Sequence, residues 1–418
     1  MKKFALIFLT MCAVTGCASI TTSNLDRVRE SFANDDFIES ASRFSDGEDI
    51  TKQDSLELLI TGLAQFQAKN YASSDNTFEE FNKRNIDTIG GSTIREAKGL
   101  LLGKLSTEYK PSMMDSLFVS YYQIWDAIGD KRYDDVRVII NQSYARQQDM
   151  SRAYADLVQK NQERETDKNS ELMSTLKQQN STWAAYTDIM NPALMYLSGI
   201  WFLTHGDYSD AQTYLQRASG MAQGNSFIKT DLNLAENNKK PTDTTWVFIE
   251  SGFAPTLKQE ELSLPVVTGN GVIVASIAVA EPAFNNSTPV SWASELADVN
   301  AMFMTEFNEY RINDALRAFT SASARAIAQA TAYNSKSSLS SLLGFGSTIF
   351  SIATTNAEVR SWVTLPERIS VLRLETANLI NSNLSAKLGS DIEFPTNGNY
   401  LIYVRLTNSK PIVHIFKI

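Results

Sequence analysis

The sequence has very few cysteines and histidines, the residue types on which many metal sites and nucleophilic catalysts depend. Its 418 residues include two cysteines, Cys12 and Cys17, and two histidines, His205 and His414. Because both cysteines lie at the start, the rest of the chain offers neither a disulfide nor a thiol site. Two histidines are too few for most zinc sites and argue against a Ser-His-Asp hydrolase. We therefore expect no bound metal and no cofactor.

Sequence motifs of common enzymes are missing as well. The chain lacks the GxSxG, GxxxxGK[ST] and HExxH patterns, so no catalytic residue is predicted from them. Adjacent carboxylates can bind a cation or act as acid and base, but such pairs on exposed helices are usually solvated. The pairs are Asp35-Asp36, Glu79-Glu80, Asp134-Asp135 and Glu260-Glu261. We expect that the protein is not an enzyme.

Basic residues are fewer than acidic ones, 38 against 47. The formal net charge is −9, and losing Lys2 and Lys3 with a signal segment would leave −11. An acidic body is a poor partner for nucleic acid or for anionic lipid, so we expect neither as a direct ligand. The length predicts two or three domains.

The first residues have the pattern of a bacterial lipoprotein signal. Lys2 and Lys3 precede an apolar run over 4–14, which is too short for a permanent membrane span. Val14-Thr15-Gly16-Cys17 then fits a lipobox, whose cysteine thiol takes a diacylglycerol before cleavage. We predict a signal peptide over 1–16 and lipidation of Cys17, which would tie the protein to the membrane. An ordinary secretory signal with an incidental cysteine is the alternative.

The residues after Cys17 indicate in which membrane the protein would be anchored. Ala18 and Ser19 follow it, and no aspartate that would favour the inner membrane stands there. We expect the periplasmic face of the outer membrane. The polar residues up to 34 are interpreted as a tether over 17–34.

The region 35–236 has the periodicity of helices, with apolar residues three and four apart. Three places repeat one pattern, in which a helix ends in a polar turn and a tyrosine begins the next helix. They surround Tyr71, Tyr133 and Tyr208, and the clearest contains Gly199 and Gly206-Asp207-Tyr208. This pattern is similar to the tetratricopeptide repeat, with irregular spacing. A generic helical bundle with the same turns is the alternative.

The residue pattern changes from helical to strand-like after a polar linker over 237–245. Strands are predicted at 246–250, 271–279 and 369–374, and a hairpin at 400–406 and 412–416. A helix is predicted over 292–333. The apolar segment 339–353 is interpreted as a buried helix pair, or as a contact with lipid or another subunit. The fold class is α+β: a helical tetratricopeptide-like domain over 35–236 and a mixed α+β domain over 246–418.

Several short motifs resemble a family of uncharacterised Gram-negative envelope lipoproteins described as tetratricopeptide-like. They are Asn191-Pro192, 196–199, 206–208, Glu250-Ser251-Gly252-Phe253-Ala254-Pro255, Arg360-Ser361-Trp362 and Leu365-Pro366. Members often accompany lipoproteins resembling the curli-secretion pore subunit or activators of peptidoglycan synthases. The resemblance implies a role in an envelope assembly and no established catalytic residues. The polar insert near 157–182 and the serine-rich segment near 335–341 depart from it.

Five aromatic and basic residues are candidate contacts for a partner protein: Tyr196, Trp201, Tyr208, Arg360 and Trp362. For Arg360 and Trp362, a structural role in an ion pair and in the core is the alternative. We expect a lipid-anchored, non-enzymatic scaffold of the cell envelope. A subunit of an outer-membrane secretion or pore assembly, and binding or hydrolysis of cell-wall glycan through an acidic pair of the second half, are the other hypotheses.

Overall fold

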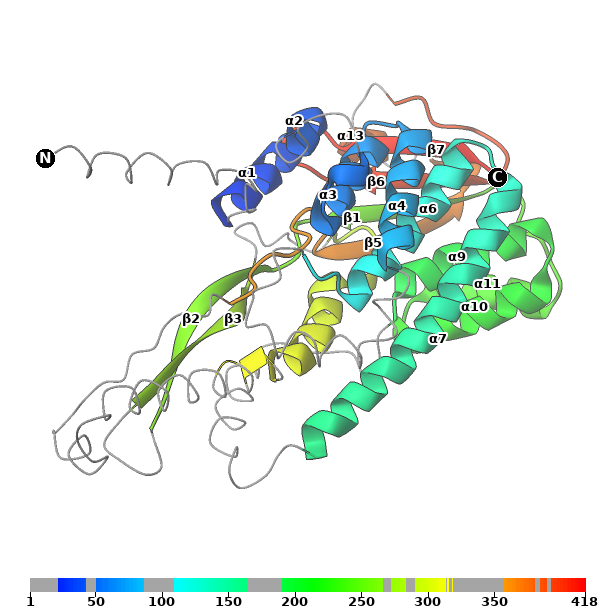
Figure 1. Cartoon of the computed structure of the whole chain (residues 1–418). Coiled ribbons are helices and arrows are strands. Elements are labelled where there is room, and N and C mark those ends of the chain that lie inside the picture. Colours follow the sequence, from blue (N-terminus) through cyan, green and yellow to red (C-terminus); the bar gives the residue numbers. More distant parts are fainter. Residues whose placement is uncertain are drawn as a thin grey trace, which may run out of the picture.

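A computed structural model shows a helical first half packed against a mixed β-sheet (Figure 1). It describes residues 22–42, 50–85, 109–163, 190–265, 272–282, 290–318 and 357–418, apart from 313, 316–317, 380–383 and 389–391. Cys17 and the segment 339–353 therefore lie outside the described residues. The α+β fold class is confirmed.

The helices of the first half follow one another as antiparallel pairs. They are α1 (Thr22–Ala33), α2 (Phe37–Ser42), α3 (Ser55–Gln67), α4 (Tyr71–Asn85), α6 (Met113–Gly129), α7 (Tyr133–Glu163), α9 (Pro192–His205), α10 (Tyr208–Met221) and α11 (Ser226–Glu236), with a short 3₁₀ turn, η1 (Ile50–Lys52), before α3. Helix α9 begins at Pro192 because the Asn191 side chain, at the N-cap, accepts hydrogen bonds from the N–H groups of Ala193 and Leu194.

In four of these pairs, the two helices are joined by a turn of the same geometry. A residue with positive φ ends the first helix, and an aromatic residue begins the next helix two positions later. The positive-φ residues are Asp35 (68°), Lys69 (64°), Lys131 (60°) and Gly206 (84°), before Phe37, Tyr71, Tyr133 and Tyr208. The intervening N–H closes each turn on a carbonyl five residues back, as in Asn70 to Gln65 (2.9 Å) and Asp207 to Phe202 (3.0 Å). Three of the four turns are those predicted from the sequence.

Close contacts recur at equivalent places in the pairs. A Cβ on Gly62 would lie 2.6 Å from the Phe78 ring, and one on Gly199 would lie 2.7 Å from Leu215. The Ser74 hydroxyl donates to the Gly62 carbonyl (2.9 Å), and Ser40 donates to Val28 in the same way (2.8 Å). The helices of a pair therefore approach closely through small residues, which is the feature expected of tetratricopeptide-like hairpins.

Five strands form the main sheet in the order β4-β5-β1-β6-β7. They are β1 (Thr244–Ser251), β4 (Ser294–Asp298), β5 (Arg368–Glu375), β6 (Tyr400–Arg405) and β7 (Ile412–Lys417). The pairing of β1 with β6 is parallel, and the other pairings are antiparallel. The predicted strand at 369–374 and the hairpin of β6 and β7 are confirmed.

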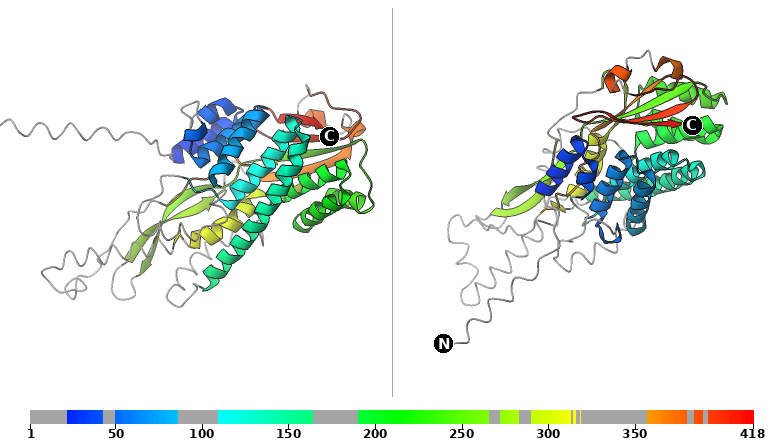
Figure 2. Two further views of the ribbon diagram at one scale, coloured as in Figure 1. Left: turned by 45° about the vertical axis from the view of Figure 1, so that its right-hand side comes forward. Right: turned by 90° about the horizontal axis from the view of Figure 1, so that it is seen from above.

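A separate two-stranded ribbon extends away from the body (Figures 1 and 2). It consists of β2 (Thr256–Pro265) and β3 (Val272–Glu281), paired antiparallel from Thr256↔Glu281 to Pro265↔Val272. The strand predicted at 271–279 is therefore confirmed as β3, although the turn that joins it to β2 lies outside the described residues.

The two faces of the main sheet are covered very differently. The helices lie along one face, where Trp125 of α6 packs edge-on against Phe248 of β1 with ring centroids 5.4 Å apart (Figure 2). A single hydrophobic core includes residues of the helices and of this sheet face. The opposite face is packed by short elements, η3 (Thr376–Asn378) and α13 (Leu384–Leu388), against Val247 and Ile402.

Three segments differ from their sequence interpretation. Residues 22–33 of the predicted tether form α1, because Leu25, Val28 and Phe32 share one helix face and are buried in the core. The predicted helix over 292–333 begins later, at position 299, because 294–298 form β4, which pairs with β5. The predicted linker 237–245 ends slightly early, since β1 starts at Thr244.

Candidate functional site

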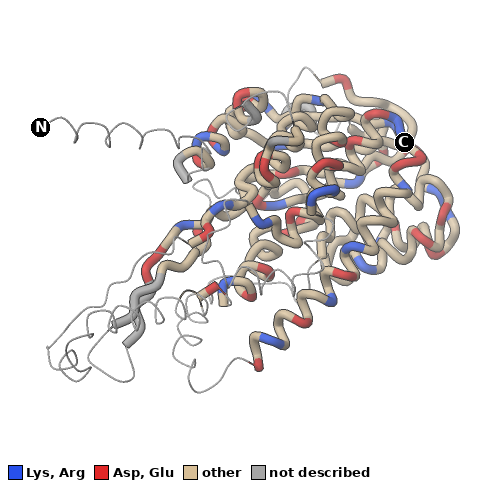
Figure 3. Tube along the Cα trace, in the orientation of Figure 1, with Lys and Arg blue, Asp and Glu red and all other residues tan. Residues whose placement is uncertain are grey.

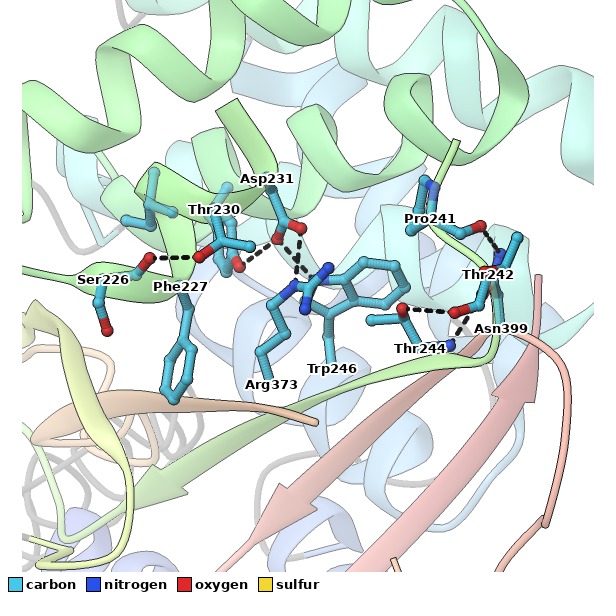
Figure 4. A network of polar contacts seen from close by, with 12 residues as sticks. Ser226, Phe227, Thr230, Asp231, Pro241, Thr242, Thr244, Trp246, Arg373 and Asn399 are labelled. Carbon is cyan, nitrogen blue, oxygen red and sulfur yellow. Dashed lines mark hydrogen bonds and ion pairs between the residues drawn. The ribbon is translucent and has the colours of Figure 1, made fainter. Parts of the chain in front are cut away.

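Tyr196, predicted as a partner contact, lies inside a buried polar network with Asp231, Trp246 and Arg373. Figure 4 labels the last three of these residues. The Tyr196 hydroxyl donates to Asp231 Oδ2 (2.6 Å), which also accepts from Trp246 Nε1 (2.7 Å). Arg373 Nε pairs with the other oxygen of Asp231 at 2.7 Å. Burial raises the pKa of the Asp231 carboxyl, while Arg373 and the two donors act in the opposite direction. The network joins α9 and α11 to β1 and β5.

Trp201 and Tyr208 lie near the turn between α9 and α10. The Trp201 side chain is buried between two other rings, with centroid distances of 5.8 Å to Tyr133 and 3.9 Å to His205. His205 Nδ1 lies 2.7 Å from the Trp201 carbonyl oxygen, so His205 packs on the last turn of its helix. Tyr208 is half-buried, whereas Tyr133 exposes 42% of its surface. Tyr133, at the start of α7, is thus the exposed aromatic residue beside Trp201, and the sequence had not singled it out as a contact.

Arg360 and Trp362 belong to the segment that precedes β5. Trp362 is buried with its ring centroid 6.1 Å from those of Phe78 and Tyr122. The Arg360 guanidinium pairs with Glu358 (2.6 Å) and lies 3.8 Å from Asp54, the N-cap residue of α3. These contacts match the structural alternative considered for both residues.

A fully buried ion pair at the helix–sheet junction was missed by the sequence analysis. Glu250 of β1 and Arg405 of β6 lie side by side, with Oε2 and Nη1 3.3 Å apart. Glu250 also accepts from the hydroxyls of Tyr403 (2.6 Å) and Tyr122 (3.1 Å). Gln67 of α3 donates to the Tyr403 hydroxyl (2.5 Å), so the network reaches α3 as well as α6.

The Arg405 side chain is enclosed by aromatic rings and carbonyls. Its guanidinium carbon lies 4.9 Å from the Phe253 ring centroid and 5.7 Å from that of Phe32. It donates to the carbonyl oxygens of Gly252 (2.9 Å) and Thr364 (3.3 Å). The only sequence signal for this network was a glutamate and an arginine at the ends of apolar strands.

A third buried carboxylate, Glu306, holds the helix over 299–312 against the start of α6. Glu306 accepts from the backbone N–H groups of Met113 (2.7 Å) and Met114 (2.9 Å). Burial is the largest influence on Glu306 and raises its pKa to about 7, and burial raises the pKa of nearby Asp115 to about 6. This junction is therefore sensitive to pH near neutrality.

Charges on the surface of the helices are mixed in sign. Along α7, basic and acidic residues alternate every three or four positions from Arg146 to Glu163 (Figure 3). Arg137 of the same helix reaches across to Asp207 (2.9 Å) and Asp210 (3.3 Å) of the neighbouring pair. Within the described residues, no group of three or more His, Cys, Asp or Glu is placed to hold a metal ion, and no helix is long and apolar enough to span a membrane.

Comparisons with known proteins add little. The chain matches no protein-family model and no curated protein. Among solved structures it is similar to a tetratricopeptide repeat protein from Parabacteroides merdae ATCC 43184, with 12% identity and a TM-score of 0.16 over 51% of this chain and 83% of that one. A likeness at this level carries no functional argument.

Proposed function

We propose that this protein is a lipid-anchored, non-enzymatic scaffold that holds a partner protein near the periplasmic face of the outer membrane. The lipobox ending at Cys17 motivates the anchor. The motifs that resemble envelope lipoproteins motivate the partner, which would belong to a secretion-pore or peptidoglycan-synthase assembly.

The proposal rests mainly on one observation: the folded body begins only five residues after Cys17. Helix α1 begins at Thr22, and its Leu25, Val28 and Phe32 are buried in the core. Five extended residue steps reach about 17 Å. Acyl chains on Cys17 would therefore hold the body, and anything bound to it, within a short distance of the lipid surface.

The packing between the two halves supports a scaffold role. The helices and the sheet share one core and are linked by the polar networks around Glu250 and Asp231. Such a body presents its binding surfaces in fixed positions, which reduces the entropy that a partner loses on binding.

The test is a comparison of Cys17→Ser with Cys12→Ser. Cys12 lies in the apolar part of the signal, so Cys12→Ser is expected to remain acylated and in the outer-membrane fraction. Cys17→Ser removes the thiol that is acylated before cleavage, so it is expected to carry no acyl chain, to keep residues 1–16 and to be absent from the outer-membrane fraction. Crosslinking in intact cells followed by purification should recover a defined envelope protein with the Cys12→Ser protein only. Recovery of Cys17→Ser in the outer-membrane fraction, or of no partner with either variant, would overturn the proposal.

A second candidate is a subunit of an outer-membrane secretion or pore assembly. The projecting ribbon of β2 and β3 favours it, because isolated two-stranded ribbons are only marginally stable without a further contact. Native mass measurement of the full chain in detergent should then show a ring of several copies. A monomer under these conditions would argue against it.

A further inference from the structure

The main sheet ends in two edge strands, and one of them is protected. Strand β4 is short, and its register with β5 shifts between Glu295 and Ala297. The carbonyl oxygen of Glu295 accepts from the Asn225 side chain of α11 (3.2 Å). A bulge and a covering side chain are common means of preventing another strand from pairing with an edge.

Strand β7, at the other edge, has neither feature. Its six residues pair with β6 in one continuous register. The N–H of Ile418 donates to the Asn399 carbonyl (3.0 Å), and alternation along the strand then turns the backbone groups of His414 and Phe416 towards β6. The N–H and C=O groups of Val413, Ile415 and Lys417 consequently point away from the sheet. Within the part of the chain that the structure describes, no residue hydrogen-bonds to them.

The side chains beside this edge suggest what would bind to it. Val413 and Ile415 are half-buried and pack against the thinly covered sheet face that contains Ile402. Lys410, which precedes the strand, and Lys417, its last residue, are exposed, and neither forms an ion pair with a described residue. The edge thus combines unpaired backbone groups, an aliphatic surface and two cations.

We propose that the β7 edge is a strand-addition site for an extended segment of a partner protein, with an aliphatic residue facing Ile415 and a carboxylate facing Lys417. Backbone hydrogen bonds would provide affinity and the alternate side chains would provide specificity. A second copy of β7 fits less well, because residues 410–418 contain no acid to pair with the lysines and two chains of net charge −9 repel each other. This site rests on the proposed scaffold function and names the kind of partner segment it would hold.

The test uses the full-length chain in detergent and two synthetic probes. Each probe is an acetylated, amidated peptide of alternating Val and Thr, with Glu at both ends in one and Lys at both ends in the other. We expect the Glu peptide to bind roughly tenfold more tightly. Its binding should slow amide exchange at Val413, Ile415 and Lys417, while His414 and Phe416 are protected already.

Substitutions at Ile415 separate the edge from the fold. Ile415→Pro removes an outward-facing N–H and should abolish binding, while continued protection of His414 and Phe416 would show that the β6–β7 ladder is intact. Ile415→Ala keeps that N–H and should bind within about threefold of the original chain. Lys417→Glu should reverse the preference between the two peptides.

Three outcomes would overturn the site: no amide protection by either peptide, equal binding by the Pro and Ala variants, or self-association that only Ile415→Pro prevents. None of these measurements depends on Cys17 or on capture of a cellular partner. Their failure would thus leave the proposed anchoring and scaffold role to be judged by its own experiment.

Discussion

Arg405 and Glu250 form an ion pair, 3.3 Å between Nη1 and Oε2, in which neither side chain is exposed to solvent. The two residues are direct register partners on the parallel strands β1 and β6. Tyr122 extends the pair to α6, so one buried network connects the helical half with the sheet. Removal of one partner would leave the other charge buried without compensation, so it is the sharpest test of the contact between the helices and the sheet.

Arg405→Met is expected to lower the free energy of unfolding by about 3–5 kcal/mol, because it leaves the Glu250 carboxylate buried without its cation. Urea unfolding followed by circular dichroism measures the change. Arg137→Met is the matched control, since Arg137 and Asp207 are about half exposed in their ion pair. The control should cost less than about 1 kcal/mol. Equal losses in the two variants would show that the buried pair is not important for stability.

Glu306 predicts a dependence of stability on pH. Its pKa of about 7 in the folded chain exceeds its ordinary value of 4.5, so the folded state favours the protonated form. The resulting stabilisation is complete below pH 4.5 and is lost as pH rises through about 7. Asp115, whose pKa is raised to about 6, acts in the same direction.

Glu306→Gln removes the titrating group and keeps one of the two oxygens that accept separately from the N–H groups of Met113 and Met114. The free energy of unfolding of the original chain, relative to that of the variant, should fall by about 3 kcal/mol between pH 4 and pH 8. Denaturant titrations at several pH values measure this difference, which includes the repulsion between Glu306 and Asp115 because the Asp115 carboxylate also raises the pKa of Glu306. Parallel pH profiles would contradict the assignment.

The glycines within the helix pairs give a prediction about close packing. Gly62→Ala and Gly199→Ala would place a Cβ within 3 Å of Phe78 and Leu215, so each should destabilise the protein by roughly 1–3 kcal/mol. Gly220→Ala of α10 is the control, because nothing lies within 4 Å of its added Cβ and alanine favours helix. Thermal unfolding should show a lower melting temperature for the first two variants and an unchanged or higher one for the third.

The helix pairs could be predicted where the residues of the connecting turn were themselves recognisable in the sequence. Tyr71, Tyr133 and Tyr208 each follow a polar turn, and the structure confirms all three turns. The fourth, at Asp35, was missed because the residues up to 34 were interpreted as a tether, so no helix was expected before Asp35. The apolar face of α1 had the three- and four-residue spacing of a helix, but its few large side chains were hidden among charged neighbours.

Features that depend on long-range pairing could not be predicted in this way. Glu250 and Arg405 are 155 positions apart and meet only because β1 and β6 pair in parallel. Likewise, β4 is a five-residue strand whose existence depends on β5, about seventy positions later. For the candidate contacts, residue type alone did not distinguish the buried Tyr196 and Trp362 from the exposed Tyr133.

The length of the tether gives a final prediction about function. Inserting about 20 Gly and Ser residues between Thr21 and Thr22 would let the body move about 25 Å further from the lipid, without altering α1. If the short connection positions a partner, crosslinking of the partner in cells should fall, while the affinity of the purified protein for that partner should stay the same. The same insertion beside Gly224, in the exposed turn before α11, leaves the tether unchanged and should preserve crosslinking. Equal crosslinking by both insertion variants would show that the distance from Cys17 to α1 has no positioning role, because only one of them changes it.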